Sequence, residues 1–463
     1  MSVLQPTAAD KSPLQELEAA LQQRVMARWA AWWARMAAEG LPTDLGALER
    51  AVEQFVHQVG QQLVAVLATA VQPTNRPTCG VCHAPLRCVD PARPITVRGI
   101  FGDYRLERAY YVCPAGHGSA TPADAAWGLG PARVTPRLAE RLCRLVVEVP
   151  FERAATLAAE LWGVAVDGET VRRVAEGVGQ VAEATEQAAQ AAVRAGQVPA
   201  PTGPGPAGLL VALDGAMVHT DGAWHEVQVG VCQALQPTAR GTWEPTGAPD
   251  YCVEVGSRTA FWPRLYAHAA AAGVESRTCH LIALIGDGAH WIWEDAGAYF
   301  GGPGKQVVEI LDFYHAAEHV WAVAHALYPA DEAAAAAWAD PLVAALRDQG
   351  PAPVQAALAM LAPPDPAAAA VVARERGYFA YHADRMDYPR YRRHGLPIGS
   401  GTVESACKVV LKQRLSQGGM RWSRVGAQAV ATLRAWHRSG RWAAFWASRP
   451  LTQRVPPKRR CAA

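Results

Sequence analysis

The chain has 463 residues, of which 50% are hydrophobic, and its 44 Lys and Arg nearly balance its 42 Asp and Glu, leaving a formal net charge of +2. This length predicts two to four folded domains, and the composition excludes a disordered or fibrous protein. No apolar run is long and uncharged enough to cross a bilayer, and the first residues lack a signal-peptide layout. We therefore predict a cytoplasmic protein without a membrane partner. The ten cysteines are scattered except for one cluster with metal-ligand spacing, which argues against a disulfide scaffold.

Residues 1–70 are predicted to form a helical N-terminal region. Apolar residues recur at helical spacing over residues 14–37, and a second helix is expected over residues 45–70. The first of these helices carries three clustered tryptophans: Trp29, Trp32 and Trp33. Tryptophans clustered on such a helix more often mark a core or a subunit contact than base stacking. We assign them no catalytic role and regard them as a candidate contact between subunits.

A zinc-ribbon-like module is predicted over residues 71–130. Strand-like alternation over residues 95–97 and 104–112 indicates a hairpin. Two pairs of candidate zinc ligands flank this hairpin, as in a zinc ribbon: Cys79, Cys82, Cys113 and His117. With all four positions filled, one Zn²⁺ ion would be structural or would serve DNA docking. Free thiols are the alternative, and His83 and Cys88 compete as ligands.

Residues 131–197 are predicted to be helical. Three helices are expected here, over residues 134–147, 151–161 and 169–177. The turn between the last two fits a helix-turn-helix in which Arg172 and Arg173 contact DNA, and a plain helical hairpin is the alternative. Residues 178–196 are Ala/Gln-rich and also read as helix. A Pro/Gly-rich segment at residues 199–208 then predicts the main domain boundary.

Residues 198–463 are predicted to form one domain with an α/β core. Five strands and two helices are expected in the order β-β-β-α-β-α-β, over residues 209–218, 224–235, 251–256, 261–272, 280–286, 291–300 and 306–311. This order is that of an RNase H-like core. A helical insertion at about residues 316–398 separates the core from a helix expected over residues 402–415, and basic C-terminal helices follow.

Three acidic residues occupy the positions at which an RNase H-like enzyme would carry metal ligands. Asp214 follows the strand of residues 209–213 and Asp287 follows that of residues 281–286, whereas Glu404 opens a helix after a turn-prone run. Taken singly, Asp-Gly is a common turn dipeptide, and a Glu in a first helical turn complements the helix dipole. The three acids in this order, however, favour a metal site over ordinary turn and helix-start residues. It predicts two Mg²⁺ ions about 3.5–4 Å apart that activate a water or hydroxyl nucleophile and stabilise the departing oxygen.

The C-terminal part of the chain is strongly basic. From Arg390 to the end there are sixteen Lys or Arg and one acid, Glu404. A phosphate backbone that approaches a bound metal requires such a basic field around the carboxylate, because each neutralised phosphate releases counterions. We therefore expect DNA contact over residues 390–441 and a solvated tail at residues 458–460.

Five longer motifs lie in the second half of the chain. They are Asp287-Gly-Ala-His-Trp-Ile-Trp293, Leu311-Asp-Phe-Tyr-His-Ala-Ala-Glu-His319, Pro397-Ile-Gly-Ser-Gly-Thr-Val-Glu-Ser-Ala-Cys-Lys408, Gln413-Arg-Leu415 and Gly419-Met-Arg-Trp422. Together they resemble the signature blocks of bacterial insertion-sequence transposases of the Kra type, which have a DDE catalytic domain. The resemblance covers most of the chain from Phe151 onward.

The resemblance implies a transposase that cuts phosphodiester bonds at the ends of its own insertion sequence and joins them to target DNA. Its partners would be double-stranded DNA, as terminal repeats and as target, and further copies of the chain, because two ends must be joined. When bound to DNA it would lie with the bacterial nucleoid. The C-terminal blocks would supply the DNA contacts Lys408, Lys412, Arg414, Arg421 and Trp422.

Two further details follow from the same resemblance. In the related Mutator-like group an acid or cysteine shortly before a histidine follows the second catalytic Asp, so Asp312 and His315 are implied as site residues. The zinc region of the family usually carries a second Cys-x-x-Cys, where this chain has Cys113 followed by His117. That departure leaves the fourth zinc ligand open.

Two other classes of protein share parts of this pattern. A catalytically silent, domesticated DNA-binding protein could keep the fold, but it would tolerate the loss of an acid, and all three acids are present. A host RNase H-like nuclease would share the metal site. Such a nuclease would have little use for a zinc module, a helix-turn-helix and basic C-terminal helices that recognise DNA ends.

Overall fold

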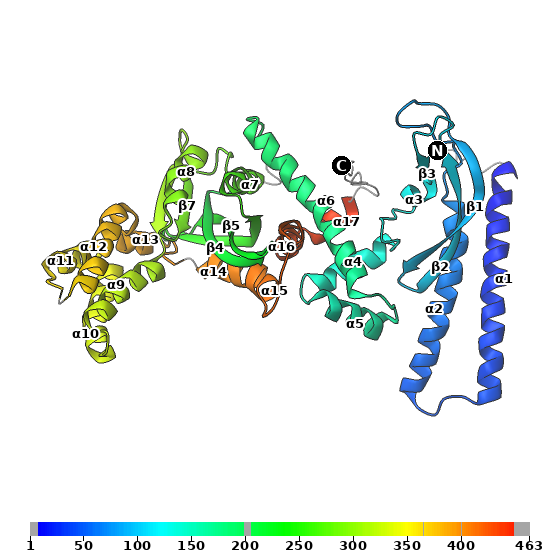
Figure 1. Ribbon diagram of the computed structural model, residues 1–463, viewed down its shortest axis with the longest axis horizontal. Helices are drawn as coiled ribbons and strands as arrows, with labels where there is room; N and C mark the ends of the chain where they lie inside the picture. The colour runs from blue at the N-terminus through cyan, green and yellow to red at the C-terminus, as the bar shows by residue number, and fades with distance from the viewer. Residues whose placement is uncertain (1–7, 199–204, 364, 400, 449–463) are drawn as a thin grey trace. The chain divides into compact units, whose positions relative to one another are not determined.

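The computed structural model describes residues 8–198, 205–363, 365–399 and 401–448 (Figure 1). The chain divides into two compact units, one of Met1–Val178 with Trp446–Ala463 and one of Gly179–Phe445. The division falls within helix α6 (Gly168–Arg194). The sequence instead predicts the boundary at the Pro/Gly-rich segment, most of which, residues 199–204, lies outside the described residues.

The first unit begins with a hairpin of two long helices, α1 (Ala8–Glu39) and α2 (Leu45–Ala70), as the sequence predicts. The Asp44 carboxylate accepts a hydrogen bond from the N–H of Ala47 and so fixes the start of α2. The rings of Trp29 and Trp33 stack with centroids 6.0 Å apart, and their exposed fractions are 44% and 52%. That exposure argues against a core role, and the subunit contact stays a prediction.

The hairpin of helices packs on a small antiparallel sheet. Its strands are β1 (Arg87–Gly99), β2 (Gly102–Val112) and β3 (Ser119–Ala120). Buried side chains alternate along the first two strands, where Ile95 pairs with Leu106 and Val97 with Tyr104. These four residues pack against α2 and form a local core. The predicted hairpin is confirmed, with a longer first strand.

Helices α3 (Pro122–Ala126), α4 (Pro136–Val146) and α5 (Phe151–Trp162) follow, and then α6 begins. The left-handed φ of 61° at Gly163 ends α5, and the Asp167 carboxylate accepts a hydrogen bond of 2.6 Å from the N–H of Thr170 at the start of α6. The turn is therefore where the sequence predicts it. The second helix is not short, however: α6 runs for 27 residues, because the alanine-rich stretch beyond residue 177 continues the helix.

The second unit is built on a five-stranded mixed sheet in the order β6-β5-β4-β7-β8. Its strands are β4 (Gly208–Thr220), β5 (Ala223–Pro237), β6 (Trp243–Val255), β7 (Leu281–Gly286) and β8 (Gln306–Leu311). The first three strands form an antiparallel meander, and β7 and β8 run parallel to β4. The predicted order of strands and helices is found. Asp214 lies within β4 rather than at its end, since the strand continues to Thr220 in its pairing with β5.

Helices cover the sheet and its edge. Helix α7 (Arg258–Ala271) packs on β5 and β6, and α8 (His290–Phe300) packs on α7. Helix α16 (Arg424–Arg438) lies along the edge strand β6, where the side-chain amide of Gln428 accepts from the N–H of Val255 at 2.7 Å and donates to the carbonyl of Val253 at 3.0 Å. These bonds occupy backbone groups that an edge strand would otherwise expose to pairing.

The helical insertion predicted after the last strand is present. It comprises α9 (Phe313–Leu327), α10 (Glu332–Gln349), α11 (Ala352–Met360), α12 (Pro366–Tyr381) and α13 (Tyr388–Arg393). Figure 1 draws these helices together in yellow and orange tones beside the strands of the second unit. None of the helices in the described residues is long and apolar enough to cross a membrane.

A buried ionic network joins the end of α6 to α7 and β6. Both ring nitrogens of His268 lie 2.8 Å from a carboxylate, Nδ1 from Asp250 and Nε2 from Glu186. Arg264, whose side chain is 2% exposed, pairs with Glu183 and with Glu254. Burial by itself lowers the pKa of His268, but the two carboxylates outweigh it and raise that pKa above its ordinary value of 6.5.

This network predicts a pH-dependent stability. The raised pKa of His268 gives a stabilisation that is complete below pH 6.5 and is lost as pH rises through the folded-state pKa. The lowered pKa values of Glu186 and Asp250 give a stabilisation that is present above their ordinary values of 4.5 and 3.8 and is lost only in stronger acid. The free energy of unfolding should therefore be highest between about pH 5 and 6.5 and fall on the alkaline side.

Urea unfolding across pH 5 to 9 measures this effect, and hydrogen exchange of α7 peptides reports it locally. His268→Gln should flatten the alkaline decline. His268→Ala should cost about 3 kcal/mol, because it removes the imidazole that bonds both buried carboxylates and leaves Arg441 as the ion-pair partner of each. Parallel pH profiles for the native chain and His268→Gln would show that the network does not titrate.

Candidate functional site

Three acidic residues lie in one row across the parallel part of the sheet. The register pairs Ala212 of β4 with Ile285 of β7, and Ile285 with Ile310 of β8. Asp214, Asp287 and Asp312 each lie two residues beyond these positions, so extending the register past the last printed pairs would align them. Neighbouring strands are about 4.8 Å apart, and side chains in register point to the same face. The predicted pair Asp214 and Asp287 is thus brought together at the carboxyl end of the parallel ladder.

The electrostatics of Asp214 reflect this arrangement. Burial raises the pKa of its carboxyl group, and the nearby charge of Asp287 raises it further. Hydrogen bonds from the Cys407 thiol and from the N–H of Gly215, the latter 2.7 Å long, oppose that rise. Asp287 accepts a hydrogen bond of 2.9 Å from the N–H of Ala289. Two partly buried carboxylates side by side are a donor set that suits a divalent cation with oxygen ligands.

The third predicted acid lies on a helix that packs against the same strands. Glu404 belongs to α14 (Gly401–Ala406), which contacts β4 and β5; the side chain of Glu404 lies outside the described residues. The helix continues as a π-helix over Cys407–Lys412. Cys407, three positions after Glu404, reaches the Asp214 carboxylate. Residue 404 is therefore one helical turn from a side chain that touches the row of acids.

The π-helix also places a positive charge beside the acids. Its i→i+5 pattern brings residues five apart towards one face, and Cys407 and Lys412 are five apart. The ammonium group of Lys412 acts on Asp214 and on Cys407 alike, lowering the pKa of both groups. Lys412 is exposed to solvent. It can therefore meet a negatively charged substrate at the edge of the site.

Asp312 and His315 occupy the start of α9, directly after β8. The Asp312 carboxylate accepts a hydrogen bond of 2.8 Å from the N–H of Tyr314 and so caps the helix. His315 is half-buried, and its Nε2 lies 3.4 Å from Nε2 of His319. Asp312 thus lies next to the row of acids, while His315 lies beside His319 and Tyr378 within the helical insertion.

A cluster from the insertion adjoins the acids. The ring of Tyr378 on α12 stacks on His319 at 3.6 Å, and a Cβ at Gly288 would lie 2.5 Å from that ring. His319 Nδ1 lies 2.5 Å from a carboxylate oxygen of Glu375, whose side chain is fully buried. Burial raises the pKa of the Tyr378 hydroxyl, and the charge of Asp287 adds to the effect. The insertion therefore forms one wall of the candidate site.

The first unit holds a separate candidate metal site. One ligand atom from each of four residues lies within 4.8 Å of the others: Cys79, Cys82, Cys113 and His117. The Cys82 and Cys113 sulfurs are 3.7 Å apart, and His117 Nδ1 is 3.8 Å from the sulfurs of Cys79 and Cys113. Tetrahedral Zn–S bonds of about 2.3 Å separate two sulfurs by close to this distance. The cluster could hold a metal such as zinc.

The surroundings of the cluster support metal binding. Backbone N–H groups of Cys82 and Val81 hold the pKa of the Cys79 thiol at about 6, which favours the thiolate that a metal needs. Cys79 and Cys113 are buried with Leu86 in a small core of their own. The competing ligands His83 and Cys88 are not part of the cluster. The metal-ligand set is the one that the sequence predicts.

The predicted DNA contacts divide into exposed and buried residues. Three of them are exposed: Lys408, Lys412 and Arg421. Arg414, by contrast, is 0% exposed and lies over the ring of Trp422, which is 8% exposed, at 5.0 Å. This cation–π pair belongs to the core, so the prediction of DNA contact is corrected for both residues. Counting basic residues does not distinguish a buried arginine from an exposed one.

Arg172 and Arg173 lie on the first turns of α6. Arg172 pairs with Glu169 at 2.7 Å and with Glu176 at 2.6 Å, and Arg173 lies 3.5 Å from Glu169. Both carboxylates compete with a phosphate for Arg172. The basic tail of residues 458–460 lies outside the described residues. Exposed positive charge free to meet DNA is therefore clearer at Lys408, Lys412 and Arg421 than here.

Sequence reasoning missed several residues that adjoin the acids. Cys407 stood inside a recognised motif, three positions after Glu404, and that spacing was the signal that could have found it. Tyr378 and Glu375 carried no comparable signal, because they lie on α12, far along the chain from Asp287, which Tyr378 approaches, and from His319, to which Glu375 bonds. Comparison with models of known protein families and with curated proteins finds no match to this chain.

Proposed function

We propose that this protein is a DNA transposase that cuts and joins phosphodiester bonds with divalent metal ions held by Asp214, Asp287 and Glu404. One observation carries the proposal: two carboxylates, each just beyond the last pair of the parallel ladder between β4 and β7, lie close enough for one to raise the pKa of the other, inside a sheet ordered β6-β5-β4-β7-β8. With the preceding antiparallel meander, this order matches an RNase H-like core, and the helix that carries Glu404 packs on the same strands.

The residues around the acids fit such a metal site. The Asp214 and Asp287 carboxylates repel one another and are partly desolvated, an arrangement that a bound cation would stabilise. Mg²⁺, when bound, would lower the pKa of a nucleophilic hydroxyl group and neutralise charge on the departing oxygen. Asp312 and Glu404 are the two further oxygen donors on elements that border the pair.

The protein's own residues would position the substrate. The Cys407 thiol holds the Asp214 carboxylate by a hydrogen bond, and the Lys412 ammonium group meets the phosphate backbone. Tyr378 and His315 face the same region from the insertion and would limit the access of water. The zinc-ribbon-like module would stabilise a separate DNA-docking surface in the first unit.

DNA binding gives a first test with an internal contrast. Lys412→Ala should weaken binding to duplex DNA about five- to tenfold, whatever its sequence, and reduce the salt dependence by about one counterion. Its unfolding free energy should change little, because Lys412 is exposed. Arg414→Ala should instead lower the unfolding free energy by about 2–4 kcal/mol through the loss of buried packing. The two variants are compared at equal concentrations of folded protein. If both then weaken DNA binding equally, the assignment of Lys412 to DNA contact and of Arg414 to the core is wrong.

The decisive experiment offers labelled DNA carrying the ends of an insertion sequence, with Mg²⁺, and separates cut products from joined products. Joined products are expected. Binding without cutting would instead identify a catalytically silent DNA-binding protein, and cutting without joining would identify a nuclease. Omission of the divalent ion is the control. Cutting and joining should then stop, since the three acids are proposed to act by holding that ion.

A further inference from the structure

Gly288 directly follows the candidate metal ligand Asp287, in the turn between β7 and α8. Its backbone does not adopt the left-handed conformation that favours glycine. The reason for a glycine here is steric: a Cβ at this position would lie 2.5 Å from a ring carbon of Tyr378 and 2.8 Å from the hydroxyl oxygen of that residue. Real Cβ atoms do not approach other atoms so closely, so an added methyl group would force the two segments apart. The ring of Tyr378 therefore rests directly on the backbone beside Asp287.

A second side chain, at the C-terminal end of α12, holds the same turn. His382 is buried, and its ring donates a hydrogen bond to the carbonyl of Gly288. Burial lowers the pKa of His382 to about 4, so the imidazole is neutral at neutral pH and has a single N–H group to donate. Tyr378 and His382 are four residues apart and therefore lie on one face of the helix. This face of α12 contacts Gly288 at its α-carbon and at its carbonyl group.

The ring of Tyr378 is itself held in place from its other side. It stacks on the imidazole of His319, with ring centroids 3.6 Å apart and planes 18° apart. Nδ1 of His319 in turn lies 2.5 Å from the buried carboxylate of Glu375, which is one helical turn before Tyr378 on α12. The hydroxyl group of Tyr378 has no hydrogen-bond partner among the described residues. The ring, rather than the hydroxyl group, therefore makes the contacts that fix this residue.

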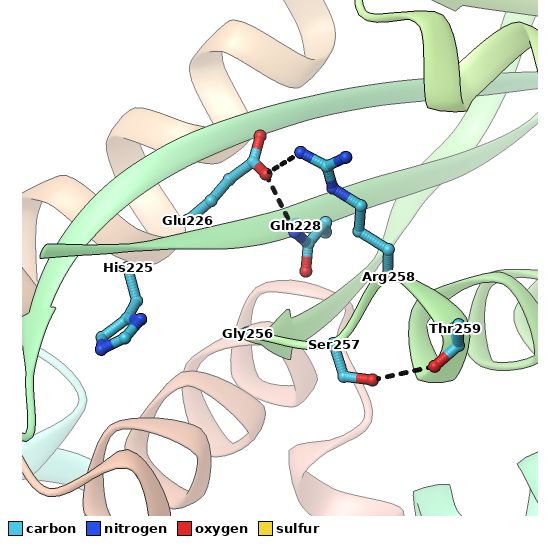
Figure 2. A pocket seen from close by; sticks show the side chains of 7 residues that line it. All are labelled: His225, Glu226, Gln228, Gly256, Ser257, Arg258 and Thr259. Carbon is cyan, nitrogen blue, oxygen red and sulfur yellow. Dashed lines mark hydrogen bonds and ion pairs between the residues drawn. The ribbon is translucent and has the colours of Figure 1, made fainter.

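The segments before and after the turn are anchored separately. Every residue of β7 is buried in the sheet. At the start of α8, Trp291 is covered by Arg258 of α7, whose guanidinium carbon lies 5.7 Å from the ring centre. The same guanidinium group bonds to Glu226 at 3.1 Å, which holds it in place (Figure 2). The turn between these two anchored elements carries Asp287, and the contacts to Gly288 described above come from α12.

We infer that Tyr378 and His382 are positioning residues, which hold the Asp287–Gly288 turn so that the Asp287 carboxylate lies beside Asp214. The metal site is then complete only when α12 of the helical insertion is docked on this turn. Metal binding and the docking of α12 stabilise one another, because both favour the same position of Asp287. The inference rests on the proposed function for the metal site itself, and it adds the insertion to that site as a positioning element.

The first test is a double-mutant cycle between Gly288 and Tyr378, measured by thermal unfolding without metal. Gly288→Ala should lower the melting temperature by roughly 5 °C, because the added methyl group collides with the tyrosine ring. In the Tyr378→Ala background the same substitution should have almost no effect, because the ring is gone. Tyr378→Phe should unfold like the native chain, since the hydroxyl group has no partner among the described residues. Additive effects of Gly288→Ala and Tyr378→Ala would overturn the contact.

The second test measures the binding of Mg²⁺ alone by calorimetry, without DNA and at a temperature at which every variant is folded. Gly288→Ala and Tyr378→Ala should each weaken Mg²⁺ binding about tenfold, as the loss of groups that orient metal ligands usually does. Tyr378→Phe should keep the native affinity. Phe379→Leu is the matched control: this ring is 0% exposed on the same helix, but the atoms nearest to Gly288 all belong to Tyr378. It should lower stability and leave Mg²⁺ affinity unchanged.

Hydrogen exchange gives the reciprocal measurement. Mg²⁺ should slow exchange over residues 375–382 in the native chain, and Asp287→Asn should lose this protection. Native Mg²⁺ affinity in Gly288→Ala and Tyr378→Ala, or an equal loss in Phe379→Leu, would overturn the positioning role alone and leave the proposed function standing. If the native chain binds no Mg²⁺, the proposed function fails and this inference fails with it.

Discussion

Asp287→Asn is expected to abolish the cutting and joining of DNA, with a rate loss of at least about a thousandfold. The asparagine keeps the size of the side chain and its hydrogen bond from the N–H of Ala289, but removes the negative charge that would hold a divalent ion. Asp214→Asn should have the same effect, because the Asp214 carboxylate lies close enough to Asp287 to share a cation with it. Asp295→Asn is the matched control, since that carboxylate is exposed on the next helix.

The same variants have a readout that does not depend on activity. Without metal, Asp214→Asn should leave the protein as stable as before or more stable, because it relieves a desolvated carboxylate of its repulsion from Asp287. With Mg²⁺ at about a hundredfold excess over its dissociation constant, the native chain should gain about 2.7 kcal/mol and the variant should not. Thermal unfolding with and without Mg²⁺ measures both effects. A metal-induced gain that persists in both Asp variants would place the metal elsewhere.

The order of elements in the second unit could be predicted because its strands are easy to recognise in the sequence. Runs such as residues 209–213 and 281–286 are continuous and apolar because both faces of the sheet are covered, and an Asp-Gly dipeptide follows each run. The order of strands and helices could therefore be read from the sequence, and Asp287 was placed directly after its strand. Asp214 was placed at a strand end because the apolar run stops at Leu213 and an Asp-Gly dipeptide follows, whereas β4 continues to Thr220 in its pairing with β5. Only the sheet register shows that the parallel ladder alone ends there.

Contacts between distant segments could not be predicted in the same way. Tyr378 approaches Asp287 from α12, and Glu375 of the same helix bonds to His319. No periodicity within that helix indicates which neighbour it will meet. Arg414 was counted with the DNA-binding residues because its charge is visible in the sequence, whereas its burial against Trp422 is not. Helix α6 is another difference between prediction and structure. A short helix was expected after the turn, but the alanine-rich sequence that follows extends it into one continuous helix.

The zinc-ligand cluster could be predicted from the spacing of its ligands in the sequence. The two pairs of ligands were identified because a hairpin between them brings its own ends together, and the structure places all four atoms within 4.8 Å. His117 was the uncertain member, since a Cys-x-x-Cys was expected at that end. The turn after Cys113 accommodates the longer spacing with glycines at positive φ, Gly116 at 77° and Gly118 at 145°. These turn residues explain why a histidine four positions after Cys113 can reach the other ligands.

Removal of the metal from this cluster is expected to unfold the ligand-bearing end of the first sheet. The small core around Cys79, Leu86 and Cys113 has few apolar side chains, so the metal would supply most of its stability. Structural zinc contributes about 10–16 kcal/mol of binding free energy in isolated zinc-finger peptides at neutral pH. Elemental analysis should find one Zn²⁺ per chain, and Cys113→Ser should lose it.

Hydrogen exchange of the apo protein or of Cys113→Ser locates the effect. Protection should be lost around residues 77–88 and 110–120, while the paired core of Ile95, Val97, Tyr104 and Leu106 under α2 should stay protected, because it packs without the metal. Cys88→Ser is the matched control: this cysteine is exposed and lies outside the cluster, so its replacement should keep both the zinc and the protection. A Cys113→Ser protein with full zinc content, or an apo protein with unchanged protection near the ligands, would show that the four residues do not form a structural metal site.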